Sequence, residues 1–178
     1  MDVTVFSNGD PIPQAKTAKE WEDAGKNNQP AWCYYENSAA NGAKFGKLYN
    51  GHAIIDPRGL APSGWHIPNI SEWILLIDFL GSESGAKKMK AINDWENNGG
   101  GTNEIGFSAY PGGQRYSDGT FNWVGKGSFF WSATVGRENC SSCNWELRAV
   151  QIFSQSNSMQ KNSVAGKESG FSVRLLKD

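Results

Sequence analysis

The chain has 178 residues with 17 Lys or Arg and 18 Asp or Glu, so its formal net charge is −1, and it is rich in Gly (21) and Trp (8). This length suits one domain with its own core, and the near-neutral charge predicts no nucleic-acid partner. No apolar run approaches the roughly 18 residues of a membrane span, and the first ten residues lack the apolar stretch of a signal peptide.

The N-terminal segment, residues 1–45, is predicted to form a strand, a helix and a second strand. Thr17 is an N-cap for a helix that starts at Ala18, because Glu20 stands where a capping box requires an acidic side chain. The other expected elements are a strand at Val3–Phe6, a turn at Asn8–Pro11, a strand at Ala31–Tyr35 and a polar loop at Glu36–Gly42.

The clearest helix follows Pro68. Its apolar residues fall on one face of a 3.6-residue period, at Trp73, Leu76, Ile77 and Leu80. Asn69 or Ser71 is its N-cap and Gly81 ends it. A second, shorter helix is expected over residues 84–92.

Beyond Asp94 the sequence changes to turns and short strands. Gly99–Gly101, Pro111–Gly113 and Ser117–Gly119 are typical of tight turns. The expected strands are Phe107–Ala109, Phe121–Val124, Phe129–Thr134, Glu146–Phe153 and Phe171–Leu176. Helices early in the chain and strands late predict an α+β domain.

A series of short motifs runs through the chain in a fixed order. They are KLYN at 47–50, APSGWHIP at 61–68, SEW at 71–73, GFSA at 106–109, PGG at 111–113, FWS at 130–132 and GFSVR at 170–174. With the opening NGDPIP and PAWCYY segments, this series resembles the Fibrobacter succinogenes major paralogous domain family over nearly the whole chain.

The resemblance implies a C-type-lectin-like fold of the formylglycine-generating-enzyme branch, with small twisted antiparallel sheets, two flanking helices and long ordered loops. Residues 46–178 would be its lectin-like core. The family's members are mostly surface or secreted proteins of bacteria and their phages. Some relatives of that branch are variable proteins of diversity-generating retroelements, in which the stretch before the closing GFSVR motif is diversified and binds ligand.

This resemblance does not predict an enzyme. The reactive cysteine pair of formylglycine-generating enzymes has no counterpart, and Leu175 stands where many family members keep a lone Cys after the Val-Arg pair. We expect no catalytic residues. Three alternatives remain: a formylglycine-generating-like oxidase, another oxidase that uses Cys140 and Cys143, and a non-binding structural unit of a surface assembly.

Several residues have both a structural and a functional interpretation. We expect Trp65, Trp73 and Trp131 in the core, Cys33 as a buried apolar residue, and His52 and His66 as packed or hydrogen-bonded side chains. Cys140 and Cys143 form a CxxC in a polar loop, which favours a local disulfide or two free thiols over a metal site. Oxygen donors for calcium stand at Asp94, Glu96, Asn97, Asn98, Asn103 and Glu104, but their spacing is not that of an EF-hand.

The segment 137–162 is the predicted ligand-binding region. Aromatic residues mixed with Asn, Gln and Ser are typical of recognition surfaces, and the resemblance favours this interpretation over a polar edge strand. We expect the domain to be displayed on a bacterial cell surface or a phage virion and to bind a protein or glycan ligand on a target surface. The expected contact residues are Glu138, Asn139, Asn144, Trp145, Glu146, Arg148, Gln151, Phe153, Gln155, Asn157 and Gln160.

Overall fold

The computed structural model describes residues 3–136 and 145–178. In the described part, the helices are α1 (Ala18–Lys26), α2 (Ala39–Phe45), α3 (Gly51–Ile54), α4 (Ile70–Leu80) and α5 (Gly85–Met89), with 3-10 turns η1 (Tyr35–Asn37) and η2 (Glu96–Asn98). The strands are β1 (Trp32–Tyr34), β2 (Lys47–Asn50), β3 (Trp65–His66), β4 (Gly112–Arg115), β5 (Phe121–Val124), β6 (Gly127–Val135), β7 (Glu146–Phe153), β8 (Met159–Gly166), β9 (Gly170–Phe171) and β10 (Leu176–Lys177). The expected α+β class is confirmed.

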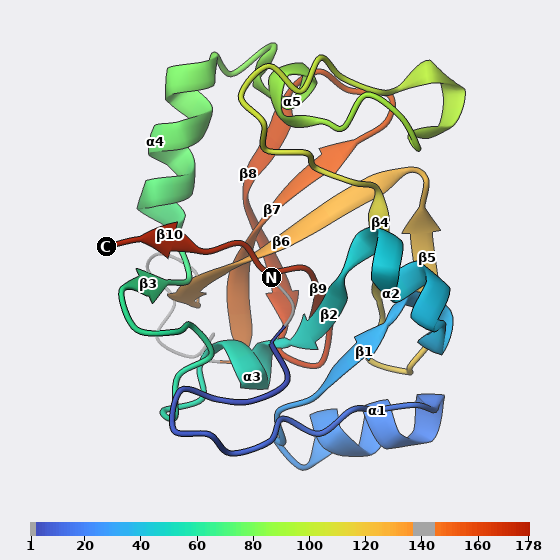
Figure 1. The fold of residues 1–178 in the computed structure, drawn as a ribbon, viewed down its shortest axis with the longest axis vertical. Helices are drawn as coiled ribbons and strands as arrows, with labels where there is room; N and C mark the ends of the chain where they lie inside the picture. Colours follow the sequence, from blue (N-terminus) through green and yellow to red (C-terminus); the bar gives the residue numbers. More distant parts are fainter. Residues whose placement is uncertain (1–2, 137–144) are drawn as a thin grey trace.

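One twisted sheet organises the described residues. Its strands run in the order β1-β2-β9-β4-β6-β7-β8, and β5 pairs with β4 at the side (Figure 1). The long strands β6, β7 and β8 form an antiparallel meander, whereas β4 and β6 pair in parallel through Gly113 and Ser128. A second, two-stranded sheet joins β10 to β3. None of the helices in the described ranges is long and apolar enough to cross a bilayer.

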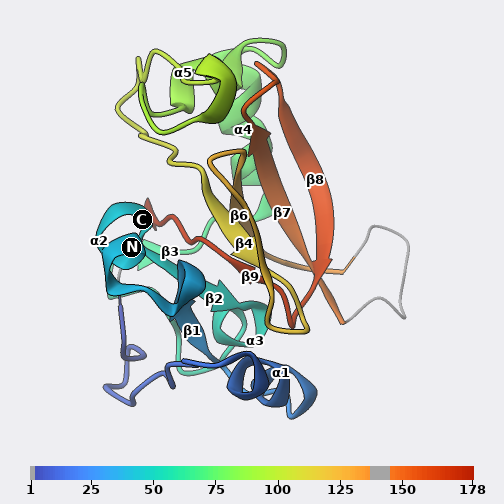
Figure 2. The same ribbon diagram turned by 90° about the vertical axis from the view of Figure 1, so that its right-hand side faces the viewer.

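Both faces of the β6–β7 pair are covered over most of their length. Helix α4 packs on one face, where Trp73 and Ile77 meet Phe130, Val150 and Ile152 (Figure 2). On the other face, Trp131, Leu147 and Ala149 pack with Tyr49 and Phe171. The Trp131 and Phe171 rings stack with their centroids 4.4 Å apart, and the Trp131 indole N–H donates to the Tyr49 carbonyl. Polar residues on β7 are therefore surrounded by packed side chains, which matters for the predicted site.

A third cluster fixes the N-terminal helix to the sheet. Trp21 of α1 packs with Cys33 and Leu48, and Arg115 of β4 lies fully buried beside the Trp21 ring. The Arg115 guanidinium donates to the carbonyl oxygens of Ala15, Thr17 and Gly119. These bonds satisfy a buried charge with backbone oxygens and join the N-terminal segment to the rest of the domain.

The helix predictions that rest on local signals are confirmed. Thr17 caps α1 and Asn69 caps α4, each through a capping box with an acidic residue at the third helical position. The predicted loop at 36–42 is wrong in its second half, since α2 begins at Ala39 within an alanine-rich run that favours a helix. The short helix α3 was not predicted.

Several strand predictions are wrong. Residues 107–109 form only an isolated bridge from Ala109 to Lys90, because Ser108 has a left-handed backbone (φ +52°) that breaks an extended run. Val3–Phe6 also forms only a bridge, from Val5 to Pro11. The predicted closing strand at 171–176 is divided between β9 and β10, which belong to different sheets. The strands β4 and β8 were not predicted.

The glycine pair at 112–113 illustrates why β4 was missed. It resembles a turn in the sequence, yet it lies in a strand where a side chain at Gly113 would meet the Asn122 carbonyl at 2.5 Å. Glycine suits these positions because the neighbouring chain approaches closely. The composition of the sequence alone does not reveal this close approach.

The core predictions are mostly confirmed. Trp73, Trp131 and Cys33 are buried, but Trp65 is 43% exposed, so its expected burial is wrong. Trp65 lies in the small β3–β10 sheet, where it is the register partner of Lys177. The neighbouring His66 is hydrogen-bonded as expected, to Asp178 and Glu72.

Candidate functional site

The described part of the predicted ligand-binding segment, residues 145–162, does not form one continuous surface. Glu138, Asn139 and Asn144, with Cys140 and Cys143, lie outside the described residues. The described part starts at Trp145, directly before β7, whose eight residues extend about 25 Å at the usual rise per strand residue. Trp145 and Phe153 therefore lie at opposite ends of one strand and cannot contact the same small ligand.

Two predicted contact residues are enclosed by the fold. Glu146 is 2% exposed and Arg148 is 5% exposed. The Arg148 guanidinium donates to the Gly136 carbonyl at 2.7 Å and to the Asn162 side chain. Because β7 is covered on both faces, these polar residues stabilise the sheet and are not presented to a ligand. Their expected place on a recognition surface is wrong.

The remaining predicted residues gather at the β7–β8 turn. Gln151 and Gln160 are register partners across the two strands. Gln155, Asn157 and Gln160 are exposed, whereas Gln151 and Phe153 are half-buried. The turn end of the hairpin thus keeps the amide side chains that the sequence prediction favoured, and it holds Phe153 as the aromatic residue among them.

Beside this turn the surface has a hollow of about 360 Å³, which we call the turn cavity. It is lined by Asn97, Trp123, Lys126, Phe153, Ser154 and Gln155. Two lining residues, Phe153 and Gln155, belong to the predicted set. Trp123 and Lys126 were missed, because nothing in the sequence indicates that the β5–β6 connection lies against the β7–β8 turn.

Trp123 is the most unusual residue of the turn cavity. Its φ of +72° lies in the left-handed region, which a bulky side chain rarely adopts, and its ring is 37% exposed. The ring contacts Phe153 edge-on, with centroids 5.5 Å apart, and its N–H donates to the Tyr116 hydroxyl at 3.1 Å. The protein thus holds a large aromatic ring, in a costly backbone conformation, at the edge of a cavity.

Backbone hydrogen bonds and close contacts hold together the three chain segments that form the turn cavity. The Glu96 N–H donates to the Gly125 carbonyl at 2.7 Å, and the Ser154 N–H donates to the Lys126 carbonyl at 2.8 Å. Gly99 lies so close to the β7–β8 turn that an added Cβ would be 2.4 Å from the Ser154 carbonyl oxygen. These contacts fix the walls of the cavity before any ligand arrives.

Lys90 supports the same turn from beneath. It is 1% exposed, and its ammonium donates to the carbonyl oxygens of Ser154 and Ser156 at 3.2 and 2.8 Å. Burial lowers the pKa of Lys90 to about 8. None of the described carboxylates forms an ion pair with it, so a buried cation holds the turn through two carbonyl oxygens.

Comparison with known proteins identifies the family. The family model described as the Fibrobacter succinogenes major domain matches residues 1–177. The chain belongs to this family. No curated protein and no solved structure matches the chain. The family match covers the turn cavity together with the rest of the fold, and it assigns no role to any residue.

In this member of the Fibrobacter succinogenes major domain family, the surroundings of Cys33, of Leu175 and of the possible metal ligands bear on the predicted chemistry. Cys33 is fully buried, and burial raises the pKa of its thiol to about 11, which disfavours the reactive thiolate. Leu175 packs against the core. Within the described ranges, no three His, Cys, Asp or Glu side chains are grouped to hold a metal ion.

Three of the six possible calcium donors make other contacts in this family member. Asp94 forms an ion pair with Lys44 at 2.5 Å, and Glu96 lies 3.8 Å from the Lys126 ammonium. The Asn103 side chain bonds to Ser108. Asn97 instead lines the turn cavity, and its side-chain amide is a group that can donate and accept hydrogen bonds.

Proposed function

We propose that this domain is a ligand-binding module and that the turn cavity binds a glycan. The observation that carries the proposal is Trp123, a half-exposed ring that the fold keeps in a left-handed backbone at the rim of a preformed cavity. Strained residues of this kind gather at functional sites, because the surrounding structure must maintain them against a cost of about 1–3 kcal/mol.

The composition of the turn cavity matches a sugar ring. The Trp123 and Phe153 rings offer flat apolar faces for the C–H face of a sugar, and Asn97 and Gln155 offer amides that both donate and accept hydrogen bonds. Its volume of about 360 Å³ lies at the small end of ligand pockets, which suits one or two sugar units. The fixed walls lower the entropy cost of binding.

The broader predictions about the fold, the location and the diversification of the domain are compatible with this proposal. A C-type-lectin-like fold and display on a bacterial or phage surface, as the family implies, agree with a glycan-binding role. Diversification of residues 137–162 stays a prediction, and a search beside the gene for a reverse transcriptase and an imperfect repeat of the 3′ coding segment tests it. A protein ligand is the second outcome that a binding screen would reveal.

A glycan array probed with the wild-type domain and with Trp123→Ala tests the proposal. We expect binding to a restricted group of glycans by the wild type and its loss in the variant, while thermal melting shows that both are folded. A protein array run in parallel covers the second outcome. Glycan binding that the variant retains in full would contradict the role of the turn cavity.

A further inference from the structure

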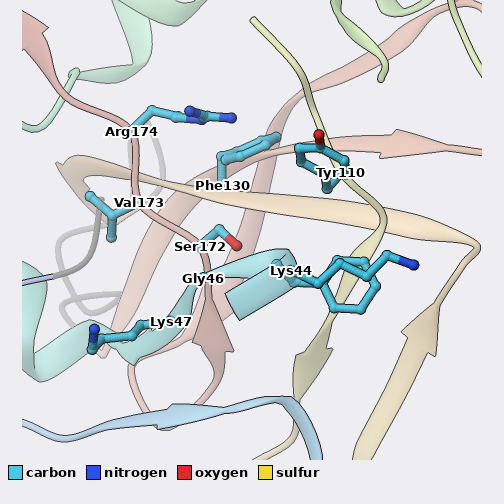
Figure 3. A pocket seen from close by; sticks show the side chains of 9 residues that line it. Lys44, Gly46, Lys47, Tyr110, Phe130, Ser172, Val173 and Arg174 are labelled. Atoms are coloured by element: carbon cyan, nitrogen blue, oxygen red, sulfur yellow. The ribbon is translucent and has the colours of Figure 1, made fainter. Parts of the chain in front are cut away.

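A second pocket lies on another part of the domain and shares no residue with the turn cavity. It has a volume of about 200 Å³ and opens between the end of α2, the loop before β4 and the segment that follows β9 (Figure 3). Its lining consists of Lys44, Phe45, Gly46, Lys47, Tyr110, Phe130, Ser172, Val173 and Arg174. The lining contains no carboxylate, and three of its side chains are cationic.

Arg174 is the group that distinguishes this pocket. Its guanidinium is stacked 4.7 Å from the centre of the Phe107 ring, and one of its nitrogens, Nη2, donates to the carbonyl oxygens of Phe107 and Ser108. Burial lowers the pKa of Arg174, yet arginine keeps its proton in proteins. None of the described carboxylates forms an ion pair with it, so its charge is not neutralised within the described structure.

The other two cations do not add an equivalent free charge. Lys44 forms its ion pair with Asp94. The Lys47 ammonium lies about 5 Å from the Trp32 and Tyr34 ring centres and points away from the pocket (Figure 3). The pocket therefore presents one positive charge without a counter-ion, which matches a monoanion better than a doubly charged phosphate.

Hydroxyl groups and rings complete the pocket. Figure 3 shows the Arg174 guanidinium extending toward Tyr110, with Phe130 between them. The Tyr110 and Ser172 hydroxyls make no hydrogen bond to any described residue, although the Ser172 backbone is fixed by bonds to Phe129 and Trp131 of β6. Hydroxyl donors that lack a partner among the described residues are available to an oxyanion.

The Arg174 geometry also limits how an anion binds. Because both hydrogens of Nη2 already point to carbonyl oxygens, a two-pronged contact through that nitrogen is blocked. Nη1 and Nε remain as donors, and each reaches a single oxygen. The anion is therefore expected to meet Arg174 through one oxygen and to use the Tyr110 hydroxyl for another.

We propose that this pocket binds the carboxylate of an acidic sugar, with a hexuronate as the ligand class. The carboxylate meets Arg174 and Tyr110, and the neighbouring Phe45 and Phe130 rings and the Ser172 hydroxyl contact the sugar ring. The uncompensated guanidinium becomes paired when the ligand binds, which offsets the cost of its burial. This proposal is independent of the turn cavity, because the two sites share no lining residue.

Calorimetric and NMR titrations with D-glucuronate, D-glucose and inorganic phosphate test the proposal on the full chain. We expect D-glucuronate to bind, glucose to bind at least tenfold more weakly, and the amide shifts to cluster at residues 44–47, 110 and 172–174. Tyr110→Phe and Arg174→Lys should each weaken glucuronate binding about tenfold, as expected for a lost hydrogen bond to a charged group. Tyr116→Phe, which touches only the Trp123 side of the molecule, is the matched control and should bind as the wild type does.

Three results would overturn the proposal. They are equal binding of glucose and glucuronate, tighter binding of phosphate than of glucuronate, and unchanged glucuronate affinity in Tyr110→Phe. Loss of binding in Tyr116→Phe, with shifts around Trp123, would move the ligand to the turn cavity and equally refute this site. If Arg174→Lys does not fold, Tyr110→Phe decides alone, because Tyr110 is 41% exposed and its hydroxyl makes no bond to described residues.

Discussion

Replacing Lys90 with methionine tests how the β7–β8 turn is held. The variant keeps a long side chain against the Trp95 ring, which lies 4.9 Å from the ammonium, but it loses the bonds to the Ser154 and Ser156 carbonyls. Hydrogen bonds from a charged donor contribute about 1.5–3 kcal/mol each. Relief from burying the ammonium offsets part of this loss, so we expect Lys90→Met to be about 1–2 kcal/mol less stable at pH 7.

The stability difference between wild type and Lys90→Met should also depend on pH. The pKa of Lys90 is about 8 in the folded protein and 10.5 for an ordinary lysine, so between these values the unfolded chain keeps a proton that the folded protein has released. The free energy of unfolding must then rise with pH, by about 1.4 kcal/mol per pH unit from this group alone. Wild type should gain on the order of 2 kcal/mol over Lys90→Met between pH 8 and 9.5.

Urea denaturation followed by tryptophan fluorescence at several pH values between 7 and 9.5 measures this difference. Groups that titrate in both proteins cancel when wild type and variant are compared at each pH. Lys87→Met is the matched control, since Lys87 is an exposed lysine of α5, three residues before Lys90. A stability difference between wild type and Lys90→Met that stays constant over this range would refute the reasoning.

Three further predictions concern the histidines and the wall of the turn cavity. The pKa of His66 is raised, mainly by its hydrogen bond to Asp178, so an NMR titration should give a midpoint above 6.5. Its contribution to the free energy of unfolding should be complete below pH 6.5 and should disappear as the pH rises through the pKa of the folded protein. His52, whose pKa is lowered by burial, should titrate below 6.5 and reduce stability as the pH falls; a His66 midpoint below 6.5 or a His52 midpoint above it would contradict the assignment for that residue. Gly99→Ala should lower the free energy of unfolding by about 1–3 kcal/mol in urea, because its Cβ would collide with the Ser154 carbonyl, and an unchanged stability would contradict that contact.

The parts of the fold that follow from local signals could be predicted from the sequence. The cap at Asn69, the apolar face from Trp73 to Leu80 and the stop at Gly81 fix α4 within a short stretch of chain. The strands β5 and β7 were likewise predicted with their observed bounds. By contrast, β4 and β8 consist largely of Gly and polar residues, and they form strands because neighbouring strands supply their hydrogen bonds.

The candidate site was predictable only in part, for the same reason. The segment around Phe153 and Gln155 was recognised by its mixture of aromatic and amide side chains. The pattern around Glu146 and Arg148 predicts an exposed face, because a strand with alternating polar residues usually has one side in contact with solvent. Here both faces of β7 are covered, so its alternating side chains pack into two different clusters. The position of Trp123 depends on a contact between segments that are far apart in the sequence, and no local pattern predicts such a contact.

The most direct test of the account compares two exposed tryptophans that flank the ends of β7. Trp123 lies at the turn cavity and Trp145 at the far end of the strand, where it is 57% exposed. For the tightest-binding glycan of an array, titration calorimetry should show at least a tenfold loss of affinity in Trp123→Ala and less than a twofold change in Trp145→Ala. Equal losses in both variants, or a loss confined to Trp145→Ala, would contradict the assignment of the ligand to the turn cavity.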